Sequence, residues 1–146
     1  MTRFNAMRCA LPATAAAAVV IGTLGAPASA QASADGCTGA PNGYVCVQVE
    51  GESRYVERLG AVRGKANWSG ICDYRAKVVV RAPSGRKWRY WSPWHRGCSY
   101  GRAWFDWYPR RNFPHESRVC ATFYEDGTRR RRGKRQGGVP CVTILR

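Results

Sequence analysis

Apolar and polar residues alternate with a period of two along much of the chain, which is the pattern of half-buried β-strands. In the segment 44–50, Val45, Val47 and Val49 share one face and polar or aromatic residues share the other. Comparable patterns predict further strands at 54–62, 76–82, 86–91, 101–108, 117–125 and 139–145. Neither a helical period nor an internal repeat follows residue 30. We therefore predict an all-β domain of about seven strands.

The segment 83–85, Pro-Ser-Gly, separates two of these strands and sets how they pair. With a three-residue loop, Val80 faces Trp88 and both point inward, while Arg89 points outward. A two-residue loop would shift the register by one residue and place Arg89 in the core. Burial of an unpaired guanidinium costs several kcal/mol, so we predict the three-residue loop.

About seven short strands at this spacing predict a small antiparallel β-sandwich of immunoglobulin-like architecture, or an open barrel. The spacing of Cys72 and Trp88 is similar to the cysteine-tryptophan spacing of immunoglobulin domains. Those domains carry a tyrosine two residues before the later cysteine, whereas Arg118 stands two residues before Cys120. We therefore expect a sandwich architecture but do not assign the chain to the immunoglobulin family.

The first thirty residues have the features of a secretory signal peptide. Arg3 and Arg8 precede the apolar run 11–24, which is short for a membrane span. Small residues place the cleavage site after Ala30, or alternatively after Ala34. We expect a bacterial, secreted protein without stable membrane insertion, in which residues 31–146 form a single domain.

Six cysteines remain after the signal peptide: Cys37, Cys46, Cys72, Cys98, Cys120 and Cys141. An even number of cysteines in a small exported chain indicates disulfides. Zinc is disfavoured because no C-x-x-C pair occurs and the chain has only 2 histidines. Pairing each cysteine with its neighbour in this order closes three successive turns. We predict these three disulfides, and neither a metal nor a cofactor.

The chain is strongly basic, with a net charge of +15. Loss of the signal peptide removes Arg3 and Arg8, so 22 basic and 9 acidic residues remain and the net charge is +13. Such a charge favours an anionic polymer, a cell-wall glycan or an acidic protein surface as partner, although it also promotes solubility. We expect a monomer.

The segment 87–108 contains five of the 6 tryptophans, with basic residues between them. The strand phases assign Trp88, Tyr90, Phe105 and Trp107 to the core. Rings on the opposite side can stack on sugars or bases while arginines pair with anionic groups, unless another sheet covers them. The predicted ligand-binding set is Arg89, Trp91, Trp94, Arg102, Trp104 and Tyr108.

A run of four arginines, Arg129, Arg130, Arg131 and Arg132, lies in a predicted loop between glycines. A block of like charges is usually a solvated loop tip. It can also contact anions by charge alone, with strong salt dependence. A third interpretation is the bait loop of a serine-protease inhibitor, because the Cys120–Cys141 bridge would hold the loop rigid.

Candidate catalytic residues are few. Glu116, His95 or His115, and Arg110 or Arg111 could supply the base, acid and anion clamp of a secreted nuclease. No motif of a serine hydrolase, zinc protease or phosphate-binding loop occurs in the chain. We therefore favour a secreted basic binding module that engages an anionic polymer or glycan. The alternatives are a serine-protease inhibitor and a secreted basic nuclease or hydrolase.

Overall fold

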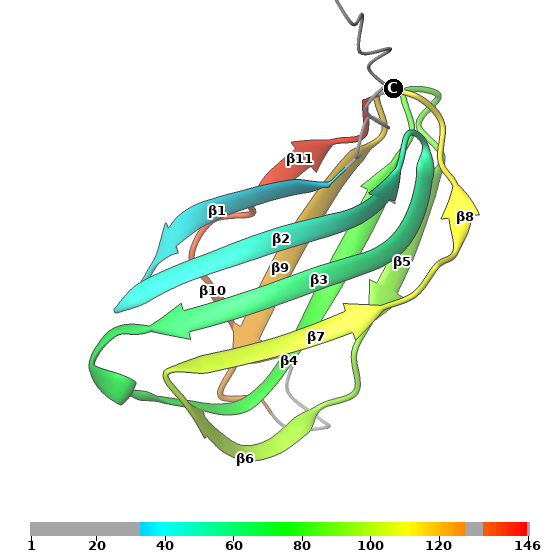
Figure 1. Cartoon of the computed structure of the whole chain (residues 1–146). Coiled ribbons are helices and arrows are strands. Elements are labelled where there is room, and N and C mark those ends of the chain that lie inside the picture. Colours follow the sequence, from blue (N-terminus) through cyan, green and yellow to red (C-terminus); the bar gives the residue numbers. More distant parts are fainter. Residues whose placement is uncertain (1–32, 128–132, 146) are drawn as a thin grey trace, which may run out of the picture.

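The computed structural model describes residues 33–127 and 133–145, which form two antiparallel sheets packed face to face (Figure 1). The predicted signal peptide and the run Arg129–Arg132 lie outside these residues. Strands make up nearly all of the regular structure, so the predicted all-β class is confirmed. In the described part of the chain, no helix is long and apolar enough to cross a membrane.

The first sheet, here called sheet I, has the strand order β1-β2-β3-β7, with a short strand β8 also paired to β3. It forms the near layer of Figure 1. Its strands are β1 (Ala34–Ala40), β2 (Gly43–Glu52), β3 (Tyr55–Lys65), β7 (Arg102–Trp107) and β8 (Arg111–Asn112).

The second sheet, sheet II, has the order β10-β9-β4-β5, and in addition β11 pairs with β9 and β6 with β4. A short 3-10 helix, η1 (Ala66–Trp68), connects β3 of sheet I to β4 of sheet II. The strands of sheet II are β4 (Gly70–Arg81), β5 (Lys87–Trp91), β6 (His95–Tyr100), β9 (Arg118–Glu125), β10 (Lys134–Gln136) and β11 (Cys141–Thr143).

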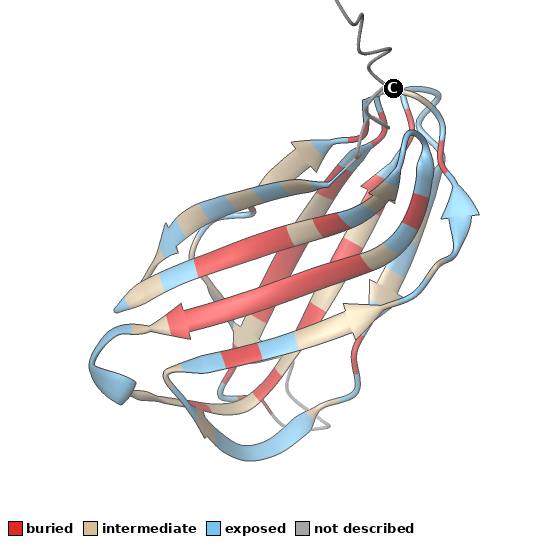
Figure 2. Ribbon diagram, in the orientation of Figure 1, coloured by how far each residue is buried: buried red, intermediate tan, exposed pale blue. Residues whose placement is uncertain are grey.

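The hydrophobic core lies between the two sheets, where the inward positions of both are buried (Figure 2). Val47 and Leu59 contribute from sheet I, and Val78, Val119 and Phe123 contribute from sheet II. The four aromatic residues predicted to be inward pack against this core, as expected: Trp88, Tyr90, Phe105 and Trp107. Alternation therefore distinguished inside from outside correctly in both sheets.

The hairpin between β4 and β5 has the predicted three-residue loop. Val80 pairs with Trp88, and Arg89 stands outward opposite Val79. The amide of Ala82 donates to the carbonyl of Arg86 at 2.9 Å, which closes the loop. Gly85 has a φ of +85°, a conformation that favours glycine.

Four strands, β1, β6, β8 and β10, were missed because their sequences lack hydrophobic alternation, and β8 and β10 span only two and three residues. The sequence of β1 has no large apolar residue, because this strand lies close against β11. A Cβ atom on Gly36 would lie 2.9 Å from a methyl group of Val142. Residues of β6 are almost all exposed, and the sequence predicted no strand there. Pairing with β4, and not burial, makes β6 a strand.

All three predicted disulfides are present, and each joins two residues that face each other on neighbouring strands. Cys37–Cys46 links β1 to β2, Cys72–Cys98 links β4 to β6, and Cys120–Cys141 links β9 to β11. The bridges therefore tie three short or peripheral strands to longer neighbours. This compensates for the small apolar surface that those strands bury.

The interior contains a charged residue that the sequence did not indicate. Arg63 follows the predicted end of its strand, yet β3 continues to Lys65 and the side chain of Arg63 is fully buried. Its Nε donates to Glu125 of β9 at 2.7 Å, so this ion pair links the two sheets. The other guanidinium nitrogens donate to the carbonyls of Pro41, Tyr44 and Gly64. Each of the three guanidinium nitrogens therefore has a hydrogen-bond partner, and together with the counter-ion these bonds make the buried charge tolerable.

Candidate anion-binding site

The six residues predicted to form one ligand-binding surface do not lie together. Arg89 and Trp91 belong to β5, on the outer side of sheet II, whereas Arg102 and Trp104 belong to β7, on the outer side of sheet I. The hydrophobic core separates these two surfaces. Alternation shows that a residue points outward, but it does not show which of two sheets carries the strand.

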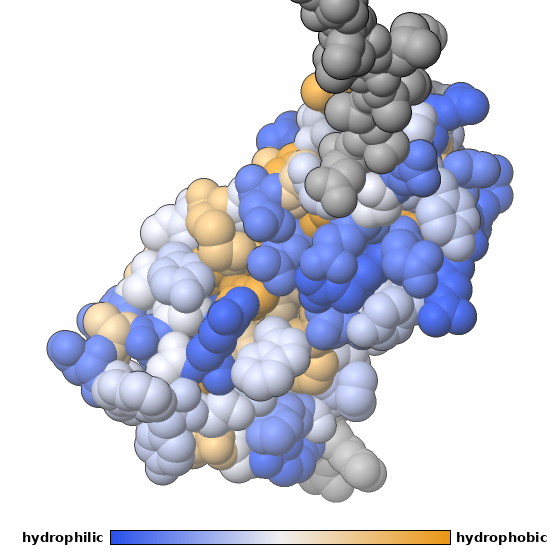
Figure 3. All heavy atoms as spheres, viewed as in Figure 1, coloured by the Kyte–Doolittle hydropathy of each residue, from blue (hydrophilic) through white to orange (hydrophobic). Residues whose placement is uncertain are grey.

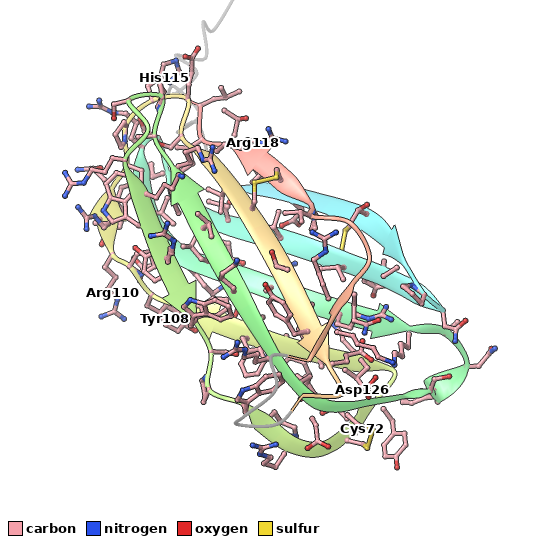
Figure 4. All side chains as sticks on the ribbon, turned by 180° about the vertical axis from the view of Figure 1, so that it is seen from behind. Cys72, Tyr108, Arg110, His115, Arg118 and Asp126 are labelled. Carbon is pink, nitrogen blue, oxygen red and sulfur yellow. A yellow bond between two sulfur atoms is a disulfide. The ribbon has the colours of Figure 1, made fainter. Side chains whose placement is uncertain are left out.

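The remaining two residues of that set lie apart from both pairs. Tyr108 follows β7 at the edge of the sandwich, where the guanidinium carbon of Arg110 lies 5.9 Å from its ring centre (Figure 4). Trp94 lies between β5 and β6 and is partly buried. Its indole contacts Gly127, where any Cβ atom would overlap the ring. Trp94 is therefore mainly a packing residue.

The outer side of sheet I has a mixture of charges that largely compensate each other. Arg58 donates to Glu50 and to Asp106, the latter at 2.5 Å. These hydrogen bonds hold the pKa of the Arg58 guanidinium above its usual range, and the bond from Arg58 lowers the pKa of Glu50. Hydrophilic residues, residues of intermediate hydropathy and apolar residues are interspersed on this face (Figure 3). It offers an anion no concentrated positive charge.

The outer side of sheet II is rich in basic residues and faces the viewer in Figure 4. The register places Lys87, Arg81 and Arg118 side by side across β5, β4 and β9. Further along the strands, Lys77 stands between Trp91 and Thr122, and Tyr124 stands between Arg75 and Arg135. We call this surface the basic face; its cationic residues are Arg75, Lys77, Arg81, Lys87, Arg89, Arg118 and Arg135. These registered outward positions include no Asp or Glu.

A groove of about 490 Å³ runs along the middle of the basic face. Its lining includes Val79, the Cys120–Cys141 disulfide, Tyr124 and Val139. Four cationic side chains line it, namely Lys77, Arg81, Arg118 and Arg135, and the described lining contains no carboxylate. The groove is therefore a concave, positively charged surface on a rigid sheet, which is the geometry that attracts and retains anions.

The arrangement of like charges has an energetic consequence. Side chains directly opposite on antiparallel strands have Cβ atoms about 4.5–5.5 Å apart, and like charges at this separation destabilise the sheet. Arg81 has such a neighbour on both sides, Lys87 and Arg118. None of the three forms an ion pair with a described acidic residue. An external anion would relieve this repulsion.

Beside the groove, aromatic rings enclose the guanidinium of Arg75. Its central carbon lies 4.3 Å from the ring centre of Trp91 and 4.6 Å from that of Trp94, and Tyr124 stacks on Trp91. These rings therefore already hold a cation of the protein itself. The Nε of Arg75 is buried and has no hydrogen-bond partner among the described atoms. Arg75 was not predicted, because it precedes the segment 76–82.

The outward orientation of other residues of the basic face follows from the sequence. The alternation in 117–125 assigns Val119, Ala121 and Phe123 to the core, so Arg118 and Tyr124 necessarily point outward. Their neighbours could not be predicted from the sequence, because the paired residues of β4 and β9 are 37 to 49 positions apart in the chain. That long-range pairing creates the row of three cations.

The two candidate catalytic histidines lie at opposite ends of the sandwich. His95 pairs with Tyr74 and stacks on its ring at 4.5 Å, near the Cys72 end of sheet II. His115 precedes β9 at the opposite end (Figure 4). The eight residues of β9 separate these ends by about 25 Å, so His95 does not share a site with His115. Nε2 of His115 lies 3.9 Å from Oε1 of Glu116, so this histidine is the one that lies beside the candidate carboxylate. Within the described residues, no cluster of His, Cys, Asp and Glu is arranged to hold a metal ion.

Comparison with known proteins gives no functional assignment. No protein-family model, curated protein or solved structure matches the chain. The inhibitor hypothesis concerns Arg129–Arg132 and stays a prediction, because that run lies outside the described residues. Function has therefore to be inferred from the shape and charge of the basic face.

Proposed function

We propose that the protein is a secreted binding protein that holds an anionic polymer on its basic face. The observation that carries this proposal is the groove lined by Lys77, Arg81, Arg118 and Arg135 without a carboxylate. Three disulfides in a domain of this size suit an oxidising, extracellular environment. The partner would be a polyanion of the cell wall or of the surrounding medium.

The spacing of the cations favours a polymer over a single small anion. Along β4, Lys77 and Arg81 line the groove and point to the same side, and Arg118 of β9 lies beside Arg81. A strand rises about 3.3 Å per residue, so Lys77 and Arg81 are about 13 Å apart. A chain that carries a sulfate, phosphate or carboxylate on successive units can contact both of them. A small anion can contact only one of them.

Charge contacts dominate this mode of binding, so affinity should fall steeply with salt. The aromatic rings take a smaller part than the sequence suggested, because Trp91 and Trp94 already hold Arg75. We expect selectivity for charge density and weak selectivity for the sugar or base that carries the charge. Sulfated, uronate-containing and phosphate-containing polymers are all candidate ligands.

The test compares two double variants that lose the same charge at different places. Arg81→Gln/Arg118→Gln removes two cations from the groove, whereas Arg54→Gln/Arg110→Gln removes two exposed cations from other surfaces. Binding to heparin and to a polyphosphate is measured at several salt concentrations. We expect the slope of log affinity against log salt to fall by about two for the groove variant and to change little for the control. Equal losses of affinity in the two double variants would show that binding depends only on net charge and would refute the proposal.

A further inference from the structure

A second hollow lies at one end of the sandwich, away from the basic face. It has a volume of about 290 Å³ and is formed by η1, the end of β3 and the turn between β6 and β7. None of its residues belongs to the basic groove. Its lining consists of Lys65, Asn67, Trp68, Tyr100, Gly101 and Arg102.

Two aromatic side chains stand at this hollow with unusually large exposure. Trp68 is 80% exposed and Tyr100 is 66% exposed, which makes them the most exposed large hydrophobic residues in the described chain. Rings of this size normally gain stability by burial. Two of them beside one hollow provide the apolar walls that are typical of ligand sites.

The backbone presents Trp68 in a conformation that is unfavourable for its residue type. Asn67 and Trp68 have φ angles of +54° and +52°, in the left-handed region. Consecutive non-glycine residues in that region persist only where surrounding contacts hold them, and such strain is concentrated at functional sites. Here the amide of Ala66 donates to the carbonyl of Asn42 at 2.8 Å, and the amide of Lys65 donates to that of Gly101 at 2.8 Å.

Gly101 forms the floor on which the Trp68 ring lies. A Cβ atom at this position would be 3.3 Å from the indole, and the φ of Gly101 is +71°. The nearby Cys72–Cys98 disulfide and the hydrogen bond from the Gly101 amide to the Ser69 carbonyl, 3.3 Å long, keep the two sides of the hollow together. The hollow is therefore preorganised before any ligand arrives.

The polar groups at the hollow identify the ligand class. Lys65 is paired with Glu125 at 2.5 Å, whereas Arg102 is exposed and forms no ion pair with a described residue. The amide of Asn67 adds a donor and an acceptor. A hollow with two aromatic walls, one available guanidinium and no acidic lining residue fits a ring that has apolar faces and an anionic substituent. Its volume lies at the lower limit for small-molecule sites, which indicates a single ring.

We propose that this hollow binds one pyranose ring that carries a carboxylate or sulfate group. The ring packs against Trp68 and Tyr100, and the anionic group pairs with Arg102. This inference does not depend on the proposed function of the basic face, because it rests on different residues.

The test uses the full mature chain and the indole N–H signals of its tryptophans in NMR spectra. Titration with a sulfated, uronate-containing disaccharide from heparin should shift the Trp68 signal to saturation, and Trp68→Phe identifies that signal. Tyr100→Ala and Arg102→Gln should each weaken binding about tenfold. Trp104→Ala is the matched control, because Trp104 is also an exposed indole, at 60%, but does not line the hollow.

Three results would overturn the inference. The first is a Trp68 signal that does not move, and the second is equal affinity for the neutral disaccharide cellobiose. The third is a Trp68 response to vesicles of anionic phospholipid but not to the disaccharide, which would assign the rings to a lipid surface. Arg81→Gln/Arg118→Gln should leave the Trp68 titration unchanged, so failure of the basic face and failure of this hollow are distinguishable.

Discussion

Replacement of Glu125 by glutamine should be among the most destabilising conservative changes in this protein. Glu125 is buried and accepts a hydrogen bond from Arg63 at 2.7 Å, while Lys65 contacts its other oxygen at 2.5 Å. Glutamine has nearly the same shape and can still accept a hydrogen bond, but it carries no charge. The guanidinium of Arg63 would then be buried without a counter-ion.

The expected loss of stability follows from the burial of both Arg63 and Glu125. Arg63 is fully buried, and the carbonyls that accept its other hydrogen bonds are not charged. Removing one partner of a buried ion pair costs about 3–5 kcal/mol, because the charge that remains has lost its compensation. Small domains are stable by about 5–15 kcal/mol, so Glu125→Gln should remove at least about a fifth of the free energy of unfolding.

The matched control is Glu50→Gln, which makes the same chemical change in another carboxylate bonded to an arginine. Glu50 pairs with Arg58 at the surface, and its side chain is 52% exposed. An exposed pair contributes at most about 1 kcal/mol. Urea unfolding with the disulfides intact, followed by tryptophan fluorescence, measures both variants. In addition, Arg63→Met/Glu125→Gln should be more stable than Glu125→Gln alone. Equal losses for Glu125→Gln and Glu50→Gln would refute the reasoning.

Two further predictions concern acid and packing. The pKa of Glu50 is lowered by its hydrogen bond from Arg58, so its stabilising effect is complete above the ordinary value of 4.5 and is lost as the pH falls through the lowered pKa. The difference in unfolding free energy between wild type and Glu50→Gln should therefore disappear in acid, and a difference that persists there would contradict this assignment. Gly127→Ala would press a methyl group into the ring of Trp94 and should cost about 1–3 kcal/mol in urea unfolding. Gly39→Ala is the control, since nothing lies within 4 Å of its Cβ position, and equal stability of the two variants would contradict the packing described here.

The like charges of the basic face and the buried ion pair illustrate two different uses of arginine. Arg63 is buried and all three of its guanidinium nitrogens donate hydrogen bonds within the protein, so it links the sheets and is not available to a ligand. Arg81 and Arg118 are exposed beside each other without acidic partners, so they remain available to an external anion. The distinction comes from the neighbours of each side chain and not from the residue type.

Several features followed from the sequence because they depend on local rules. The two-residue period identified most strands, and their phases separated Trp88 and Tyr90 in the core from Trp91 outside it. The cost of burying Arg89 correctly selected the three-residue loop before β5. Sequential cysteine pairing was also correct, since each bridge closes a segment of at most 26 residues.

Only the tertiary structure decided which outward residues share a surface. The period of two assigns a side chain to the inside or the outside, but a sandwich has two outsides. Pairing of β4 with β9, and of β3 with β7, places Trp91 and Trp104 on opposite surfaces and brings Arg81 beside Arg118. These pairings join segments far apart in the chain, so the charge pattern of the basic face exists only after the sheets have formed.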